Sequence, residues 1–81
     1  MSVADAANGT VSLTFWGRLG DRFQASDAHP LAGAKTVADL RARIGLQDSS
    51  VRAVVGGAVV SDTAPLAPGD RVEFLPPVGG G

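Results

Sequence analysis

The sequence contains no cysteine and only one histidine, and these two features exclude several kinds of chemistry. Without cysteine there can be no disulfide framework, no thiolate zinc site and no cysteine nucleophile. His29 has no acidic partner at metal-ligand spacing, so we expect a surface or turn histidine rather than a metal ligand or triad member. The composition fits a reducing compartment, and no metal site is expected.

Strong charge of one sign and long apolar runs are also missing. Seven basic and eight acidic residues give a formal net charge of −1 without a basic stripe, so no binding to nucleic acid or membrane is expected. No apolar run approaches the length of a membrane span. The first nine residues lack the basic and apolar regions of a signal peptide. We therefore expect a cytoplasmic protein.

Residues arranged for catalysis are lacking too. The carboxylates are scattered, and a helix start explains Asp39 while a turn explains Asp70, so no acid–base pair stands out. The stretch GRLGDR at 17–22 has neither the spacing nor the ending of a phosphate-binding loop. We expect a protein that is not itself an enzyme and that binds no cofactor.

The chain does have the composition of one small globular domain, with 81 residues of which 44% are hydrophobic and 19% charged. Residues 1–9 are predicted to be a flexible leader. Residues 10–16 alternate as a strand whose outer face includes the large aromatic Trp16. The inner face of this strand is predicted to contain Val11, Leu13 and Phe15.

A short connection and one helix are predicted next. Leu19 and Phe23 are four residues apart, so both can pack from a helical turn. Residues 28–33 form a weak strand in which Pro30 suits a sheet edge. The clearest helix covers 36–45, with a Thr36–Asp39 cap and Gly45 as its end. Its predicted inner residues are Val37, Leu40 and Ile44, with Leu46 as a hydrophobic cover, and its predicted outer residues are Arg41 and Arg43.

The second half of the chain reads as three strands. Residues 51–60 indicate a hairpin around Gly56–Gly57, and Pro68–Gly69 match the centre of a type II turn. The strand at 71–75 should turn Val72 and Phe74 inward and Arg71, Glu73 and Leu75 outward. The order of elements predicts an α+β domain at residues 10–78, with a mixed sheet of four to five strands packed on one main helix. This is the layout of a ubiquitin-like β-grasp, in which the first and last strands pair in parallel at the sheet centre.

The last strand is followed by two prolines and then by VGGG. Because proline has no N–H, strand pairing ends at Pro76. We expect Pro76, Pro77, Val78 and Gly79 to position a tail, with residues 79–81 flexible. Gly80 and Gly81 lack Cβ atoms and can approach another protein's backbone closely, so we expect the tail to enter narrow sites.

From Leu66 to Gly81 the sequence LAPGDRVEFLPPVGGG resembles the ubiquitin-like sulfur carriers, a family that includes the small subunit of molybdopterin synthase and the thiamine-pathway carrier. The shared pattern is a leucine, a Pro/Gly-Asp turn, a Val-x-Phe strand, a Pro-Pro-Val exit and a terminal Gly-Gly. Upstream, VSLTFWG, TVADLRARIG and VVGGAVVS follow the family's order, so the resemblance covers roughly Thr10 onward. The Pro-Pro-Val step is most similar to the molybdopterin branch.

The resemblance implies a chemistry for Gly81. In the family, an adenylyltransferase of the ubiquitin-activating type uses ATP to convert the terminal carboxylate to an acyl-adenylate. A sulfur donor protein then supplies the sulfur that turns it into a thiocarboxylate. By this resemblance, sulfur carried on Gly81 would pass to a pterin precursor in the large subunit of molybdopterin synthase.

The family docks its enzymes on the outer sheet face, so the resemblance also implies a partner-binding surface. Trp16, Val59 and Leu75 are apolar residues on that face and are the candidates for it. Arg71 and Glu73 would flank them and supply polar contacts. Two other functions stay open: a sulfur carrier for thiamine, cysteine, tRNA thiolation or a natural product, and a protein modifier joined to lysines through Gly81.

Overall fold

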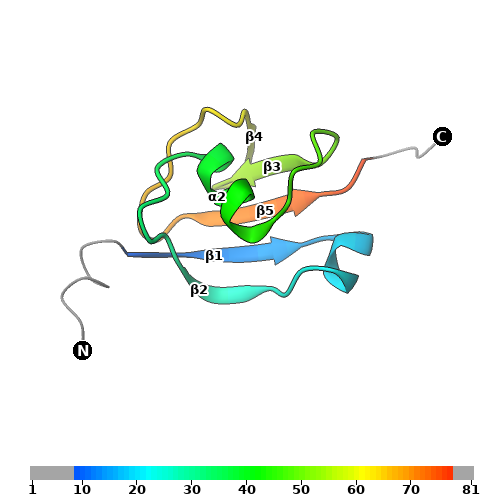
Figure 1. Ribbon diagram of the computed structural model, residues 1–81, viewed down its shortest axis with the longest axis horizontal. Helices are drawn as coiled ribbons and strands as arrows, with labels where there is room; N and C mark the ends of the chain where they lie inside the picture. Colours follow the sequence, from blue (N-terminus) through cyan, green and yellow to red (C-terminus); the bar gives the residue numbers. More distant parts are fainter. Residues whose placement is uncertain (1–8, 78–81) are drawn as a thin grey trace.

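A computed structural model describes residues 9–77 of the protein. The elements follow in the order β1 (Thr10–Phe15), the 3-10 helix η1 (Gly17–Asp21), β2 (Ser26–Pro30), α2 (Val37–Ile44), β3 (Arg52–Val55), β4 (Ala58–Val60) and β5 (Arg71–Leu75). Figure 1 shows α2 lying across one face of the sheet. Of the predicted leader, residues 1–8 lie outside the described residues, as does the whole predicted tail at 79–81.

The sheet has five strands in the order β2-β1-β5-β3-β4. Its central pair, β1 and β5, is parallel, with Leu13 beside Val72 and Phe15 beside Phe74. The other three pairs are antiparallel. The predicted mixed sheet, with its first and last strands adjacent at the centre, is therefore present.

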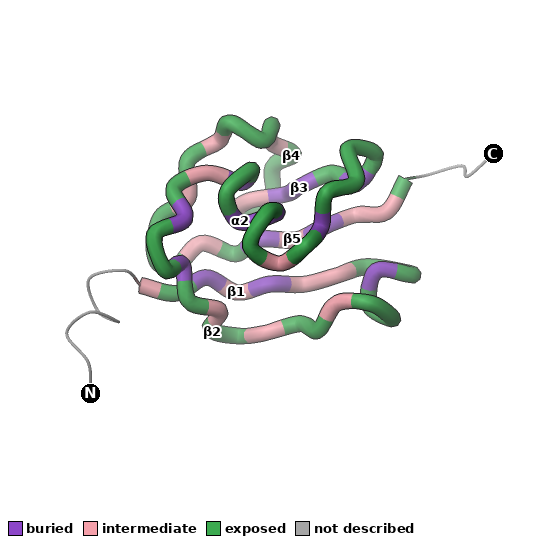
Figure 2. The backbone as a smooth tube through the Cα atoms, viewed as in Figure 1, coloured by how far each residue is buried: buried purple, intermediate pink, exposed green. Residues whose placement is uncertain are grey.

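The core fills the space between the sheet and α2. Alternation on β5 leaves Val72 and Phe74 fully buried, and α2 contributes Val37 and Leu40, which are also fully buried. Figure 2 shows the buried residues along the central strands where α2 covers them. Burying side chains of this size contributes about 1.5–3 kcal/mol each, so this layer supplies most of the stabilisation of a small domain.

An aromatic stack extends the core toward the end of β1. The Phe15 ring lies 5.2 Å from the Phe23 ring and 5.5 Å from the Phe74 ring, in stacked geometry. Leu19 on η1 is buried, as predicted, and its carbonyl accepts a hydrogen bond from the Phe23 N–H at 2.9 Å. The short helix therefore seals the core next to the point where β5 ends.

The ends of α2 follow the sequence prediction. The Thr36 side chain accepts from the Asp39 N–H, and the Asp39 carboxylate accepts from the Thr36 N–H, which completes a capping box. The bonds from the Lys35 and Thr36 backbones lower the pKa of Asp39. Gly45 ends the helix with φ 81°, and Leu46 is buried behind it.

Tight turns join the remaining strands. In the β3–β4 hairpin, Gly56 and Gly57 have φ values of 60° and 88°, and a two-residue hairpin turn of this kind requires positive φ at both positions. The predicted turn at Pro68–Gly69 is closed by a hydrogen bond from the Asp70 N–H to the Ala67 carbonyl at 3.1 Å.

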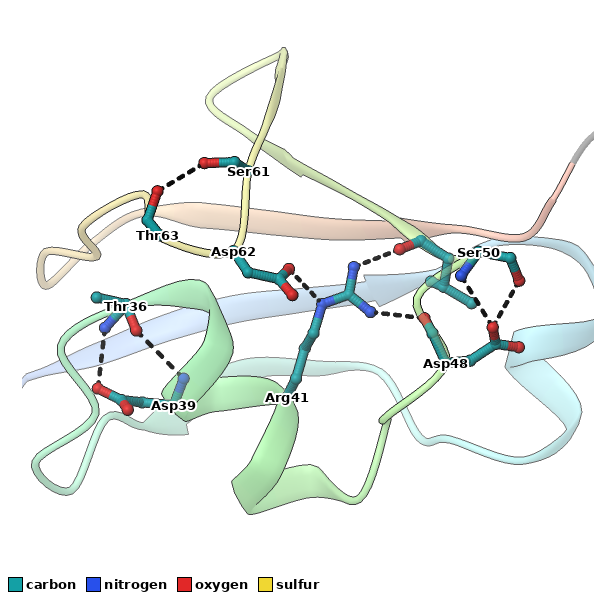
Figure 3. A network of polar contacts seen from close by, with 9 residues as sticks. Thr36, Asp39, Arg41, Asp48, Ser50, Ser61, Asp62 and Thr63 are labelled. Carbon is teal, nitrogen blue, oxygen red and sulfur yellow. Dashed lines mark hydrogen bonds and ion pairs between the residues drawn. The ribbon is translucent and has the colours of Figure 1, made fainter.

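The prediction for Arg41 was wrong, because its side chain does not point into water. Only 6% of Arg41 is exposed. Its guanidinium donates to the carbonyls of Asp48, at 3.0 Å, and Val51, and its Nε lies 2.9 Å from a carboxylate oxygen of Asp62 (Figure 3). Helical periodicity alone could not reveal these partners, because all three lie outside the helix, two in the loop that follows it and one near the end of β4.

The second strand also differs from its predicted bounds. It runs from Ser26 to Pro30 instead of 28–33, and Leu31 beyond it is buried in the core. Its pairing with β1 shifts register between Val11 and Leu13. As expected, β2 is an edge strand that tolerates Pro30.

Candidate docking face and tail root

The outer face of the sheet, opposite α2, carries a row of side chains that crosses four strands. Thr14 on β1 lies beside Glu73 on β5, Glu73 lies beside Val54 on β3, and Val54 lies beside Val59 on β4. Residues that are remote in sequence therefore come together on one surface.

Trp16 is fixed on this face although it is half exposed. Its side chain is 50% exposed, yet its indole Nε1 donates a hydrogen bond of 2.9 Å to the Glu73 carboxylate. Its backbone N–H donates to the Phe74 carbonyl at 3.1 Å, which continues the parallel ladder one residue past β1. An exposed tryptophan held at both backbone and side chain loses little conformational entropy when a partner covers it.

The outer face has an apolar centre that the sequence reading missed. Val54 is only 8% exposed, but it does not belong to the core cluster around Phe74. Its neighbour Ala53 pairs with Phe74 and faces the core, so Val54 faces outward. Strand alternation carried this signal, but only the register shows that Val54 lies between Glu73 and Val59.

The predicted docking residues are only partly adjacent. Trp16 comes directly after β1 and Leu75 is the last residue of β5, so both lie at the same end of two neighbouring strands. Val59 is on β4, which β3 separates from β5. Val59 and Leu75 nevertheless line one hollow together. Arg71 is exposed at the opposite end of β5, beside Ser12. Glu73 bonds to Trp16, so its polar contact is within the protein.

Two hollows flank the root of the tail, Pro76–Pro77. The outer hollow opens on the docking face and is lined by both prolines with Ser49, Ser50, Arg52, Val59 and Leu75. The inner hollow opens on the side of η1 and is lined by both prolines with Gly17, Arg18, Leu19, Arg22, Asp48 and Val51. The chain therefore leaves β5 between two concave surfaces.

Gly17 sets how closely the tail root approaches β1 and η1. A Cβ atom added at Gly17 would lie 3.2 Å from Cγ of Pro76, and Gly17 has φ 57°. A side chain here would therefore crowd the proline and strain the backbone. The sequence reading did not identify this contact, because 59 positions separate the two residues.

The segment that separates the two hollows is held by Arg41. Its guanidinium binds the carbonyls of Asp48 and Val51, and Ser50 lies between them. Hydrogen bonds from the Ser50 hydroxyl, at 2.6 Å, and backbone N–H, at 2.9 Å, lower the pKa of Asp48. Figure 3 shows these contacts around one short loop. The buried guanidinium of Arg41 therefore holds in place the segment that lines both hollows.

Other kinds of site are not evident in residues 9–77. In this part of the chain, no three His, Cys, Asp or Glu side chains gather as a metal site would require. Among the same residues, no helix is long and apolar enough to cross a membrane. Four predicted site residues, Val78, Gly79, Gly80 and Gly81, lie outside the described residues.

The architecture and the exit of the chain beside β1 define a ubiquitin-like β-grasp protein. The structure is similar to the crystal structure of SAMP1 from Haloferax volcanii, with a TM-score of 0.63 and 22% sequence identity over 90% of this chain and 100% of that chain. This likeness confirms the predicted fold. No curated protein matches the sequence.

The chain belongs to the ThiS family, whose model matches residues 13–81. The resemblance to ubiquitin-like sulfur carriers is therefore confirmed at the level of the family. Such proteins are generally carriers or modifiers rather than catalysts, and they generally work with activating enzymes.

Proposed function

We propose that this protein is a sulfur carrier that holds sulfur as a thiocarboxylate on Gly81. The family match carries the proposal, because it extends through Gly81. The geometry of the root supports it: Pro76 and Pro77 project from the end of β5 between two hollows. A stiff root reduces the entropy lost when a tail enters an enzyme.

The proposed reaction has two steps. The carboxylate of Gly81 attacks the α-phosphate of ATP, which forms an acyl-adenylate and releases pyrophosphate. Hydrosulfide delivered by a donor protein then attacks the acyl carbon, so that a C–S bond forms, the C–O bond to AMP breaks and the thiocarboxylate is left on Gly81. The carrier supplies only the carboxylate and its presentation, and the adenylyltransferase supplies the ATP site.

The outer face is the surface proposed to dock the partner enzymes. Trp16 is an exposed aromatic anchor, Leu75 adjoins the tail root, and Val59 shares its hollow. Buried aromatic anchors dominate the energetics of many interfaces. Arg71 is proposed to add a polar contact, and a charge reversal at Arg71 that leaves partner binding unchanged would remove it from this surface.

The proposed recipient of the sulfur is the large subunit of molybdopterin synthase. The support is the sequence Pro76-Pro77-Val78 before the glycines, which is most similar to that branch. The large subunit would bind the thiocarboxylate tail in its catalytic pocket and pass the sulfur to a pterin precursor.

Intact mass spectrometry tests the carrier chemistry. The protein is incubated with ATP, a sulfur source and a ubiquitin-activating-type adenylyltransferase, beside a matched variant that lacks Gly81. We expect a mass gain equal to the exchange of one oxygen for sulfur in the full sequence and no gain in the variant. Adducts joined to lysines of other proteins, without any thiocarboxylate, would point to a protein modifier instead.

The pathway needs a separate test. The thiocarboxylated protein is mixed with a molybdopterin synthase large subunit and its pterin precursor, and in parallel with the thiazole-forming enzyme of thiamine synthesis. Loss of sulfur to the pterin alone is the expected result. Transfer only in the thiamine reaction would retain the carrier chemistry and reject the proposed recipient.

A further inference from the structure

Three arginines surround the root of the tail. Arg18 and Arg22 line the inner hollow together with Pro76 and Pro77. Arg52 lines the outer hollow together with the same two prolines. All three arginines are exposed, so positive charge flanks the departing chain on both sides.

These arginines differ from the cations elsewhere in residues 9–77. Within that part of the chain, the ion pair found joins Arg41 to Asp62, and Arg43 donates to the Ala32 carbonyl. No such bond within residues 9–77 engages the three arginines at the root. Arg22 is steadied by the Phe23 ring, 5.7 Å from its guanidinium carbon, which leaves its donors available.

The acidic groups nearby offset only part of this positive charge. Asp48 lines the inner hollow, and its carboxylate, which accepts two hydrogen bonds from Ser50, also attracts Arg22. Asp21 is on η1 and is exposed. Three guanidinium groups against two carboxylates leave an excess of positive charge at this end of a protein whose formal net charge is −1.

The length of the tail limits how far from these arginines an enzyme bound to Gly81 can lie. Gly81 is four residues beyond Pro77, which at full extension is at most ~14 Å. An enzyme that reaches the Gly81 carboxylate must bring its own surface about this close to the root. Because the Gly81 carboxylate must also enter the enzyme's site, the rim of that site lies closer to the root than the full length of the tail. Part of the rim therefore comes within the ~8–10 Å over which charges interact at ordinary ionic strength.

We propose that Arg18, Arg22 and Arg52 form a cationic collar that binds a carboxylate-rich surface on the enzyme receiving the tail. The inference rests on the proposed function and adds the charge of the partner surface to it. Arginine forms paired hydrogen bonds with carboxylates. Charges at the rim of an interface mainly accelerate association and fix orientation. The collar therefore guides the tail, while the apolar outer face holds the complex.

Association kinetics test the collar. The probe is the adenylyltransferase of the ubiquitin-activating type, taken from two species, and stopped-flow fluorescence measures its association rate with the chain at low and high salt. Charge is reversed in the double variant Arg18→Glu/Arg22→Glu and in Arg52→Glu. The control is Lys35→Glu, which makes the same charge change as Arg52→Glu and half that of the double variant. Lys35 lies just before α2, where its carbonyl accepts from the Leu66 N–H, and it does not line either hollow at the root.

We expect the unmodified protein to associate more slowly as salt rises. The double variant should associate about tenfold or more slowly at low salt and should lose most of the salt dependence. Arg52→Glu should show a smaller loss, and Lys35→Glu little change. Circular dichroism shows that each variant is folded.

The outcomes separate the collar from the carrier chemistry. Arginine-dependent association without any thiocarboxylate would support the collar and reject the proposed function. Thiocarboxylate formation with equal association rates for the double variant and Lys35→Glu would overturn the collar alone. Absence of association with both enzymes would overturn the collar. A parallel gel-shift assay with tRNA covers the other charged partner: variants that bind the enzyme at an unchanged rate but no longer shift tRNA would also overturn the collar, because the arginines would then bind a nucleic acid.

Discussion

The two faces of the sheet hold their large apolar side chains by different means. On the inner face, Phe74 is fully buried among neighbours that include Phe15 and the residues of α2. On the outer face, Trp16 is half exposed and its side chain is fixed by one hydrogen bond to Glu73. Close packing makes the inner face sensitive to the loss of any methylene. The single hydrogen bond on the outer face fixes the Trp16 side chain, but the stability of the fold does not depend on that bond.

The largest expected difference comes from removing one aromatic side chain from each face. Phe74→Ala should lower the free energy of unfolding by about 3–5 kcal/mol, because it removes buried area and leaves a cavity. Trp16→Ala should lower it by about 1 kcal/mol or less, since half of that side chain is already in water. Urea unfolding followed by circular dichroism measures both. Equal losses would contradict the division between the faces.

Replacing a buried arginine should lower the free energy of unfolding more than replacing an exposed one. Arg41→Met should cost about 1–3 kcal/mol, because it leaves the buried carbonyl of Val51 and the partly buried carbonyl of Asp48 without their donor. Arg52→Met, on the exposed side of the tail root, should change stability by about 0.5 kcal/mol or less. The same unfolding measurement applies, and a small effect at Arg41 would show that water replaces its guanidinium.

Two glycines with nearly the same backbone angle allow a sharper comparison. Gly17 has φ 57° and Gly56 has φ 60°, but only Gly17 has Pro76 within 4 Å of an added Cβ. Each glycine-to-alanine change should cost about 1–2 kcal/mol through the left-handed backbone. Only Gly17→Ala should also shift the amide resonances of Leu75 and slow thiocarboxylate formation. Equal resonance shifts in both variants would dismiss the contact with Pro76.

Acid should destabilise the loops on the helix side of the sheet, where two carboxylates accept hydrogen bonds. Backbone and side-chain donors lower the pKa values of Asp39 and Asp48 from an ordinary value of 3.8. A lowered pKa in the folded state adds stability above the ordinary value, and this is lost as pH falls through the lowered one. Stability should therefore decline below about pH 4, and Asp39→Asn should flatten the decline. An unchanged pH profile in that variant would assign the acid sensitivity elsewhere.

The smallest expected change in stability belongs to Glu73. Glu73→Ala should alter the free energy of unfolding by about 0.5 kcal/mol or less, but it frees the Trp16 indole. Trp16 is the single tryptophan and the chain has no tyrosine, so fluorescence reports this side chain alone. Anisotropy should fall and acrylamide quenching should rise, whereas Glu73→Gln, which keeps an acceptor oxygen, should resemble the unmodified protein. Identical anisotropy in all three would show that the bond does not restrain Trp16.

The sequence could predict those parts of the structure that depend on neighbouring residues. Alternation placed Val72 and Phe74 inward, the Thr36–Asp39 pair marked the start of α2, and the paired glycines marked the hairpin. Each of these signals acts over a few residues. The parallel pairing of β1 with β5 followed from the predicted order of elements and the fold it matches.

The missed features depend on contacts between distant segments. Arg41 is buried because carbonyls seven and ten residues away, together with Asp62, surround its guanidinium. The bond between Trp16 and Glu73 spans 57 residues, and the arginines at the root come together only when β1, β3 and β5 are aligned. Sequence periodicity reports which side a residue faces. It does not report what another strand will place there.

The parallel pairing of β1 with β5 also has a consequence for the order in which the protein is made. Ser12 and Arg71 lie side by side at the centre of the sheet, although nearly the whole domain separates them in sequence. Pairing of such distant segments is slow to form, and during translation it must wait until β5 leaves the ribosome. Only then does Pro76 meet Gly17. The root that would offer Gly81 to an enzyme therefore forms only once β5 has paired with β1, and an enzyme that recognises the root would select chains in which this pairing is complete.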